Sequence, residues 1–85
     1  MAHFVYIIYS ESFDVYYKGS SENPFKRLIE HNENLSNYTS GKGPWKLVYV
    51  EELIDKTNAL KREIKLKRQN RKYIEWLILQ PINKI

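Results

Sequence analysis

The sequence contains no cysteine, and its only histidines are His3 and His31. Disulfides, thiolate zinc sites and multi-histidine metal sites are therefore excluded. No apolar stretch approaches the roughly 18 residues that a membrane-spanning helix needs. The N-terminal residues also lack the basic segment and the sustained apolar segment of a signal peptide. These absences predict a cytoplasmic protein that does not enter the membrane.

The composition is typical of one small globular domain. Hydrophobic residues make up 42% of the 85 residues, well above the content of disordered chains. A chain of this length rarely divides into two independent cores. We therefore expect residues 1–85 to form a single domain.

Positive charge is concentrated in one segment. Residues 56–72 hold eight cations and one carboxylate, a net charge of +7, so the other residues carry −3 of the overall +4. Such a segment on a mildly acidic body is the electrostatic footprint of a phosphate-rich partner. A solvated helix face explains a basic helix equally well. The predicted nucleic-acid-binding residues are Lys56, Lys61, Arg62, Lys65, Lys67, Arg68, Arg71 and Lys72.

Hydrophobic periodicity predicts an α+β fold with the order β-β-α-β-α-α, a small three-stranded antiparallel sheet flanked by helices. Residues 3–9 are apolar on both faces, which is typical of a central strand. Asn23 followed by Pro24 marks the start of a helix. Asp55 or Thr57 is expected to cap the second helix and Asn70 the third. The expected strands are residues 3–9, 15–19 and 45–50, and the expected helices begin near residues 24, 56 and 71.

Strand alternation predicts which side chains share a face of the sheet. In an antiparallel hairpin, facing residues have a constant index sum, and turns centred near residue 12 give sums of 23 or 25. Either sum places Tyr6 and Tyr17 on one face, directly opposite or diagonal, whereas a sum of 24 separates them. An aromatic core pair is the alternative explanation. Simple alternation places Trp45, Leu47 and Tyr49 together on one face of the third strand.

Glu63 is a lone carboxylate on an apolar helix stripe. It follows Ala59 by four residues and precedes Leu66 by three, so it lies on the inward side of its helix. An inward carboxylate costs free energy unless it is paired or bound to a metal ion. Metal binding and a salt bridge to Arg27 or Lys67 are equally good explanations.

Arg27 and His31 lie at positions i and i+4 on one face of the first helix. This spacing would present an arginine to a phosphate and a histidine to a transferring proton. A pair between Arg27 and Glu30, with His31 simply exposed, is the alternative.

These pieces, in this order and at these spacings, resemble the GIY-YIG nuclease family over residues 3 to about 78. The resemblance is closer to the small single-domain bacterial members than to the excision-repair incision subunit, which carries additional DNA-binding domains. After the last helix, where several relatives carry an asparagine, the order here is Pro81-Ile82-Asn83. The residues that carry the resemblance are Phe4-Val5-Tyr6 for Gly-Ile-Tyr, Tyr17-Lys18-Gly19 for Tyr-Ile-Gly, Arg27, His31, the strand Pro44–Tyr49, and Glu63.

The resemblance implies metal-dependent phosphodiester hydrolysis on nucleic acid, DNA rather than RNA, with low sequence specificity and a place in DNA repair. A protein partner would supply further specificity. Tyr6 would act as base or position the water, Tyr17 would position the water or the phosphate, and Arg27 would bind the phosphate. His31 would relay a proton, and Glu63 would hold one Mg²⁺ or Mn²⁺.

Two other classes of function stay open. The first is a nucleic-acid-binding module that keeps the fold without cutting. The second is a protein-interaction domain that uses the last helix, where Trp76 and Leu79 are expected to be exposed. The retained tyrosines and Glu63 favour the nuclease, because a binding module has no need for an inward carboxylate near phosphates.

Overall fold

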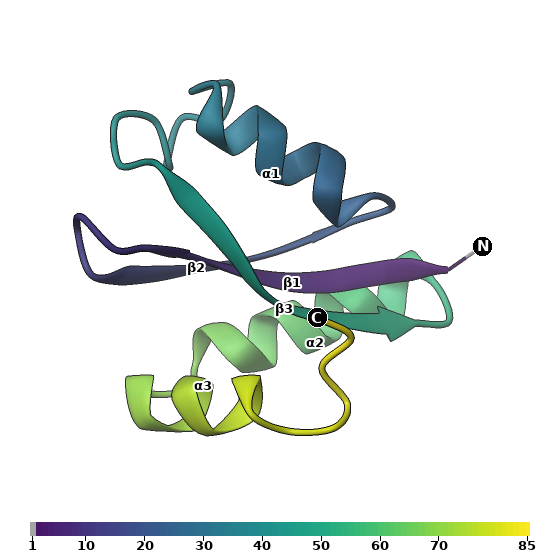
Figure 1. Ribbon diagram of the computed structural model, residues 1–85. Helices are drawn as coiled ribbons and strands as arrows, with labels where there is room; N and C mark the ends of the chain where they lie inside the picture. Colours follow the sequence, from purple (N-terminus) through teal and green to yellow (C-terminus); the bar gives the residue numbers. More distant parts are fainter. Residues whose placement is uncertain (1) are drawn as a thin grey trace.

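The fold is a three-stranded antiparallel sheet with helices on both of its faces (Figure 1). The computed structural model describes residues 2–85. The predicted α+β class and the order β-β-α-β-α-α are confirmed. Across this part of the chain the elements are β1 (His3–Ser10), β2 (Val15–Ser21), α1 (Pro24–Asn32), β3 (Trp45–Leu53), α2 (Lys56–Lys67) and α3 (Arg71–Ile78).

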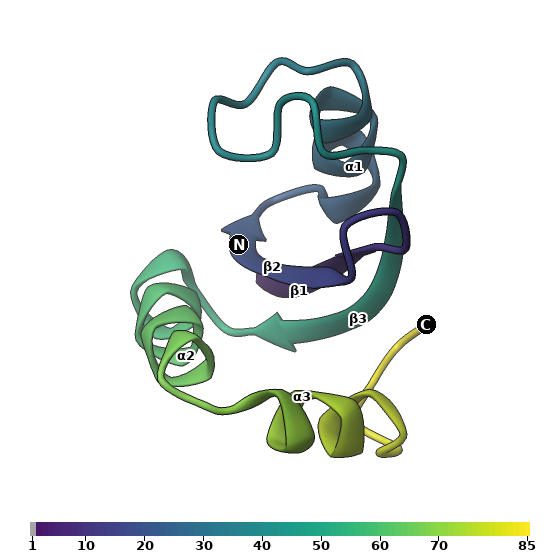
Figure 2. The same cartoon turned by 90° about the vertical axis from the view of Figure 1, so that its left-hand side faces the viewer.

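β1 is the central strand, as its apolar pattern predicts, and it pairs antiparallel with β2 and with β3. Val5 and Ile7 pack against residues of α2 and α3, whereas Tyr6 and Ile8 face the opposite side, where α1 lies. Figure 2 shows the curved sheet with α1 over one face and α2 and α3 over the other. A strand with two apolar faces is therefore buried between two helical layers.

Side-chain caps fix where each helix begins. The side chain of Asn23 accepts from the backbone N–H of Lys26 at 3.1 Å, and Pro24 occupies the first turn. Asp55, rather than Thr57, caps α2, and Asn70 caps α3. Each cap satisfies a backbone donor that has no partner inside its helix.

One expectation for β3 is wrong. Trp45 and Leu47 lie on the α1 side, but Tyr49 lies in the core beneath α2 and α3. Ile7 and Ile8, which are neighbours on β1, pair with Tyr49 and Leu47, so β3 has one extra residue at this point. A bulge of this kind shifts the side-chain period by one, which moves Tyr49 to the other face.

The C-terminal residues cover the free edge of β3. The side chain of Asn83 accepts from the backbone N–H of Val50 at 3.0 Å and donates to the carbonyl of Val48 at 2.9 Å. The backbone N–H of Lys84 donates to the carbonyl of Val50. These bonds occupy edge groups that would otherwise be available to another strand.

Within residues 2–85, no helix has the length and apolar character required to cross a membrane.

Candidate active site

The hairpin register places Tyr6 and Tyr17 on the same face of the sheet. The observed pairs, Tyr6 with Gly19 and Ile8 with Tyr17, correspond to the index sum of 25. The two tyrosines are therefore diagonal neighbours on the α1 side. Lys18, which replaces the isoleucine of the second motif, pairs with Ile7 and lies on the opposite face.

Gly19 makes room for the phenol of Tyr6. A Cβ added at Gly19 would lie 2.5 Å from the hydroxyl oxygen of Tyr6 and 2.7 Å from its Cζ. No side chain fits at that distance, so the ring of Tyr6 can cross the backbone of β2 only where the facing residue is glycine. This steric requirement explains why the second motif has a glycine at this position.

The hydroxyl of Tyr6 begins a buried chain of hydrogen bonds. It lies 2.8 Å from Nε2 of His31, and Nδ1 of His31 lies 2.7 Å from Oγ1 of Thr39. The hydroxyl of Thr39 lies 3.5 Å from the carbonyl oxygen of Ser36, the acceptor nearest to it besides His31, so its lone pairs are available to the Nδ1 proton. We therefore assign the proton of His31 to Nδ1, so that Nε2 accepts the proton of Tyr6.

Burial separates the pKa values of this pair. Burial raises the pKa of Tyr6 to about 12, and the guanidinium of Arg27 opposes that shift. Burial, assisted by the charge of Arg27, lowers the pKa of His31 to about 4. At neutral pH the resting pair is therefore a protonated phenol donating to a neutral imidazole.

The low pKa of His31 predicts a pH-dependent stability. Between pH 6.5 and about 4, His31 binds a proton in the unfolded chain but not in the folded chain. The contribution of His31 to the free energy of unfolding is therefore fully present above pH 6.5 and is lost as the pH falls toward about 4. The expected loss at pH 4 is about 3 kcal/mol. Urea unfolding of the wild type and of His31→Gln across this range measures it. If the two proteins lose stability in parallel, His31 is not the group responsible.

Arg27 has free donors despite its ion pair. One of its terminal nitrogens lies 2.7 Å from a carboxylate oxygen of Glu30, which confirms the expected alternative pairing. The guanidinium carries five N–H groups, so one such bond leaves others for a phosphate. His31, in contrast, is fully buried and not simply exposed.

Glu63 approaches the same place from α2. Its side chain is 15% exposed and pairs with Lys67 at 2.7 Å, so the salt bridge foreseen as an alternative is present. Its negative charge contributes to the raised pKa of Tyr6. Tyr17 in turn packs edge-on against the ring of His31, with centroids 5.2 Å apart. The structure therefore gathers Tyr6, Tyr17, Arg27 and His31 on the α1 side of the sheet, and it places Glu63 near enough for its charge to influence the pKa of Tyr6.

The potential metal ligands of this site suit a hard divalent cation better than zinc. Across residues 2–85, no three side chains of His, Cys, Asp or Glu gather as a metal cluster. Both ring nitrogens of His31 already have partners. Glu63 offers carboxylate oxygen, and Mg²⁺ commonly uses one or two carboxylates and keeps its remaining ligands as water and phosphate oxygen. Glu63 could therefore hold Mg²⁺ or Mn²⁺, in exchange for Lys67 or beside it.

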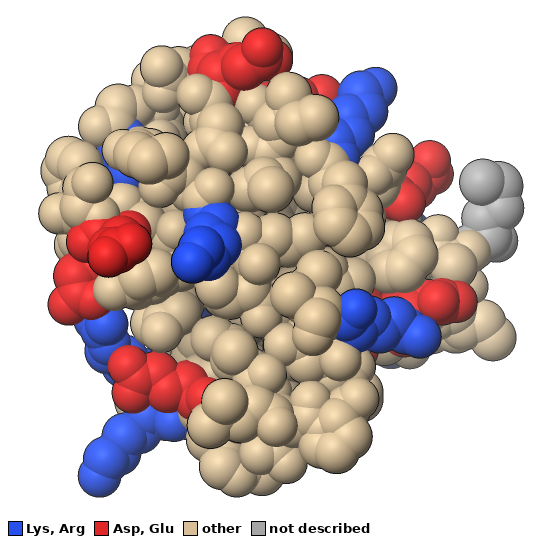
Figure 3. Space-filling view, in the orientation of Figure 1, with Lys and Arg blue, Asp and Glu red and all other residues tan. Residues whose placement is uncertain are grey.

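The predicted basic residues do not form one uniform patch. Arg62 pairs with Glu51, Lys67 with Glu63, and Arg71 with Asp14 and Glu75. Figure 3 shows acidic and basic side chains interspersed on the face that it presents. The members that form no ion pair within residues 2–85 are Lys56, Lys61, Lys65, Arg68 and Lys72.

Lys61, Lys65 and Arg68 lie at i, i+4 and i+7 and therefore form a stripe along α2 and its C-cap. Reversing Lys65 and Arg68 to glutamate should weaken nucleic-acid binding equally for all sequences and lower the salt slope by about 1 per lost phosphate contact. Fluorescence anisotropy over a salt series measures both effects. The double variant Lys46→Glu/Lys84→Glu makes the same change in net charge elsewhere. Equal effects of the two variants would move the binding surface away from α2.

Sequence reasoning missed the role of one residue and the identity of another. Gly19 was named only as part of the second motif, and its steric role could have been found, because the index sum of 25 puts it directly opposite Tyr6. Thr39 carried no usable signal, because it lies in an irregular segment whose path the sequence pattern does not define.

Comparison with known proteins identifies the family of this chain. The sequence-family model of the GIY-YIG catalytic domain matches residues 2–76. The UPF0213 protein of Aeromonas hydrophila is 34% identical over 79 residues, which cover 92% of this chain and 57% of that protein. A UPF0213 protein of Staphylococcus epidermidis is 37% identical over 70 residues, 81% of this chain and 84% of that protein.

The chain spans only about half of this Aeromonas hydrophila protein and of a UPF0213 protein of Aeromonas salmonicida, 57% and 48% of their lengths. The solution NMR structure of a UPF0213 protein from Bacillus halodurans is similar with a TM-score of 0.60 and 27% identity, covering 99% of this chain and 89% of the other. Since the catalytic-domain model covers nearly the whole chain and the small relatives share its fold and sequence, the protein belongs to the GIY-YIG family.

Proposed function

We propose that this chain is a divalent-metal-dependent nuclease that hydrolyses phosphodiester bonds with little sequence preference, in DNA rather than RNA. The observation that carries the proposal is the buried chain from Tyr6 through His31 to Thr39, which begins beside Arg27 and Glu63. A protein that only binds nucleic acid needs cations. It has no need for a proton acceptor buried behind a phenol.

In this mechanism the chain's own residues bind the phosphate and handle the proton. Glu63 would hold a Mg²⁺ or Mn²⁺ ion, and such an ion would supply charge relief at the phosphate oxygens and the leaving oxygen. The free guanidinium donors of Arg27 bind the non-bridging oxygens of the phosphate. The hydroxyl of Tyr17 orients the attacking water, and the oxygen of Tyr6 accepts a hydrogen bond from that water.

The proton of Tyr6 moves only in the assembled site. A pKa of about 12 for Tyr6 and about 4 for His31 keeps the proton on the phenol while the site is empty of substrate. The charge of Glu63 helps to hold the pKa of Tyr6 high. Arg27 lowers the pKa of Tyr6, and a cation held by Glu63 would act in the same direction. Tyr6 takes the water's proton while its own passes to Nε2 of His31, to which it is already hydrogen-bonded.

The non-cutting module is the second candidate, and the ion pair between Glu63 and Lys67 favours it, because a structural glutamate would make the same contact. The two candidates differ in one measurement. Labelled single-stranded, nicked and branched DNA and RNA are incubated with Mg²⁺ or Mn²⁺, with wild type beside Glu63→Ala. Metal-dependent cleavage that Glu63→Ala lacks supports the nuclease, and binding without cleavage by either protein supports the module.

The protein-interaction alternative keeps one supporting feature. Trp76 and Leu79 on the outer side of the α3 region are 53% and 82% exposed, as expected. A partner that adds specificity would find apolar surface there, and this remains a prediction.

A further inference from the structure

An exposed aromatic side chain stands beside the candidate active site on a well-anchored segment. Residues 33–44 connect α1 to β3, and Tyr38 within them is 65% exposed. Asn34 accepts from the backbone N–H of Gly41 at 3.0 Å, and Ser10 donates to the carbonyl of Lys42 at 2.5 Å. A segment fixed in this way presents an aromatic ring to solvent at a defined position.

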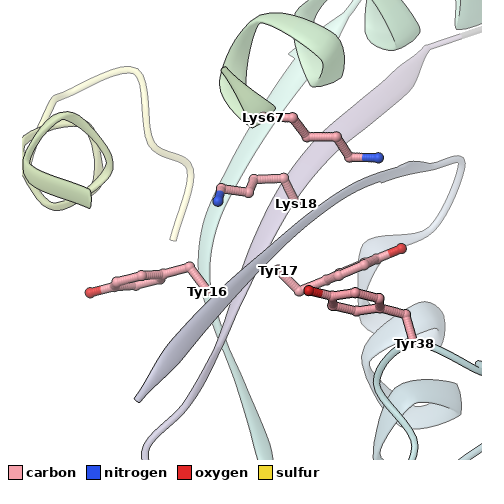
Figure 4. Close-up of a pocket in the computed structure, with 5 residues that line it drawn as sticks. All are labelled: Tyr16, Tyr17, Lys18, Tyr38 and Lys67. Atoms are coloured by element: carbon pink, nitrogen blue, oxygen red, sulfur yellow. The ribbon is translucent and has the colours of Figure 1, made fainter. Parts of the chain in front are cut away.

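The ring of Tyr38 lies against a residue of the site. Its centroid is 5.4 Å from that of Tyr17, with 34° between the ring planes (Figure 4). Nζ of Lys42 lies 4.4 Å from the centroid of the Tyr38 ring. Thr39, the next residue, ends the hydrogen-bonded chain that begins at Tyr6. Tyr38 is therefore positioned by the same segment that orients His31.

Two lysines line the same pocket as the two tyrosines. Lys18 and Lys67 contribute to its wall together with Tyr16, Tyr17 and Tyr38 (Figure 4). Lys67 reaches the side of β2 on which Tyr17 and Tyr38 lie, whereas Lys18 extends to the side of Tyr16 (Figure 4). The tyrosine side of the pocket thus combines an exposed aromatic ring with the half-exposed ammonium group of Lys67, which pairs with Glu63. This is the chemistry of a nucleotide subsite: a base stacks on the ring and its phosphate meets the ammonium group.

We propose that Tyr38 stacks on the base next to the scissile phosphate, and that the substrate is consequently a strand whose nucleotide is unpaired at this position. A base inside a duplex has both faces covered by its neighbours, so it is not available to stack on Tyr38. Lys67 then holds the neighbouring phosphate. This inference rests on the proposed function, because it assigns the substrate class of the same site.

The test measures binding in the absence of divalent metal, so that no strand is cut. A labelled single strand, its duplex, and a series of strands with one abasic position each are titrated against wild type, Tyr38→Ala and Tyr38→Phe. Stacking on one base predicts that Tyr38→Ala loses about 10-fold or more in single-strand affinity, while Tyr38→Phe keeps it. Phe25→Ala, which removes another exposed ring from α1, is the matched control and should bind as wild type does.

The abasic series localises the contact. Wild type should lose a similar factor when one particular base is missing, and Tyr38→Ala should be insensitive to the same deletion. Equal affinity of Tyr38→Ala and wild type, or equal wild-type affinity for single strand and duplex, overturns the proposal. Cleavage with Mg²⁺ is scored separately. If cleavage does not change when Tyr38 is substituted, the base subsite is rejected and the proposed nuclease activity stands. If binding depends on Tyr38 but no strand is cut, the nuclease activity is rejected and the base subsite stands.

Discussion

Glu63→Gln should reduce cleavage by at least about 100-fold while nucleic-acid affinity stays the same or rises slightly. The substitution keeps the size of the side chain and removes the carboxylate proposed to hold the cation. It also removes a negative charge near the bound phosphate, which accounts for the direction of the change in affinity. Single-turnover cleavage with Mg²⁺ and anisotropy titrations without it measure the two quantities separately.

The fold should tolerate this substitution. The ion pair between Glu63 and Lys67 includes a half-exposed lysine, and such pairs contribute at most about 1 kcal/mol to stability. Glu75→Gln is a matched control, because Glu75 is also a helical glutamate in an i,i+4 ion pair, with Arg71. It should leave cleavage unchanged.

Arg27→Ala gives a useful contrast, since loss of a cation on the phosphate side should damage binding and cleavage together. If Glu63→Gln unfolds the protein and never produces a cleavage deficit separable from folding, Glu63 is a structural partner of Lys67. The non-cutting module would then be the better description of this chain.

Local physical chemistry explains why much of the fold could be predicted. Asn23, Asp55 and Asn70 each satisfy a backbone donor within three residues, so their capping role depends only on nearby sequence. The same-face placement of Tyr6 and Tyr17 follows from the two-residue period of a strand and the length of the turn. Neither inference requires knowledge of distant contacts.

The features that could not be predicted depend on long-range contacts. The bulge in β3 turns Tyr49 into the other core layer, and nothing in the alternation of residues 45–50 marks the extra residue. Thr39 reaches His31 only because its loop is anchored elsewhere, with Trp45 donating to its carbonyl at 3.2 Å. Side chains on irregular segments are placed by such anchors and not by a repeat in the sequence.

Charge distribution illustrates the same limit for the candidate binding surface. The count of cations in residues 56–72 predicts a phosphate-rich partner, but it does not distinguish a free lysine from one that is paired. Arg62 is held by Glu51, which also accepts from the hydroxyl of Tyr49. Its first role in the fold is therefore to neutralise a buried carboxylate. A cation of this kind contributes less to phosphate binding than its place in the segment suggests.

The second large effect is expected from Tyr6→Phe. This change keeps the ring that crosses Gly19 and removes only the hydroxyl that donates to His31. Without this hydroxyl, no group can take the proton of the attacking water and pass its own to His31. The rate of cleavage should therefore fall by about 10²- to 10⁴-fold. Nε2 of His31 is left buried without its donor, which should cost about 1–3 kcal/mol of stability.

Tyr49→Phe separates the catalytic effect from the structural one. Tyr49 is a fully buried tyrosine of the same sheet, and its hydroxyl donates to Glu51 on the opposite face. Its loss should also destabilise the fold, because a buried carboxylate loses one of its two donors and keeps only Arg62, yet cleavage should persist. Urea unfolding and single-turnover cleavage of both variants give the comparison. If both variants lose cleavage in proportion to their loss of stability, the Tyr6 hydroxyl serves only the fold. If Tyr6→Phe cleaves like the wild type, the proton takes a path that does not pass through His31.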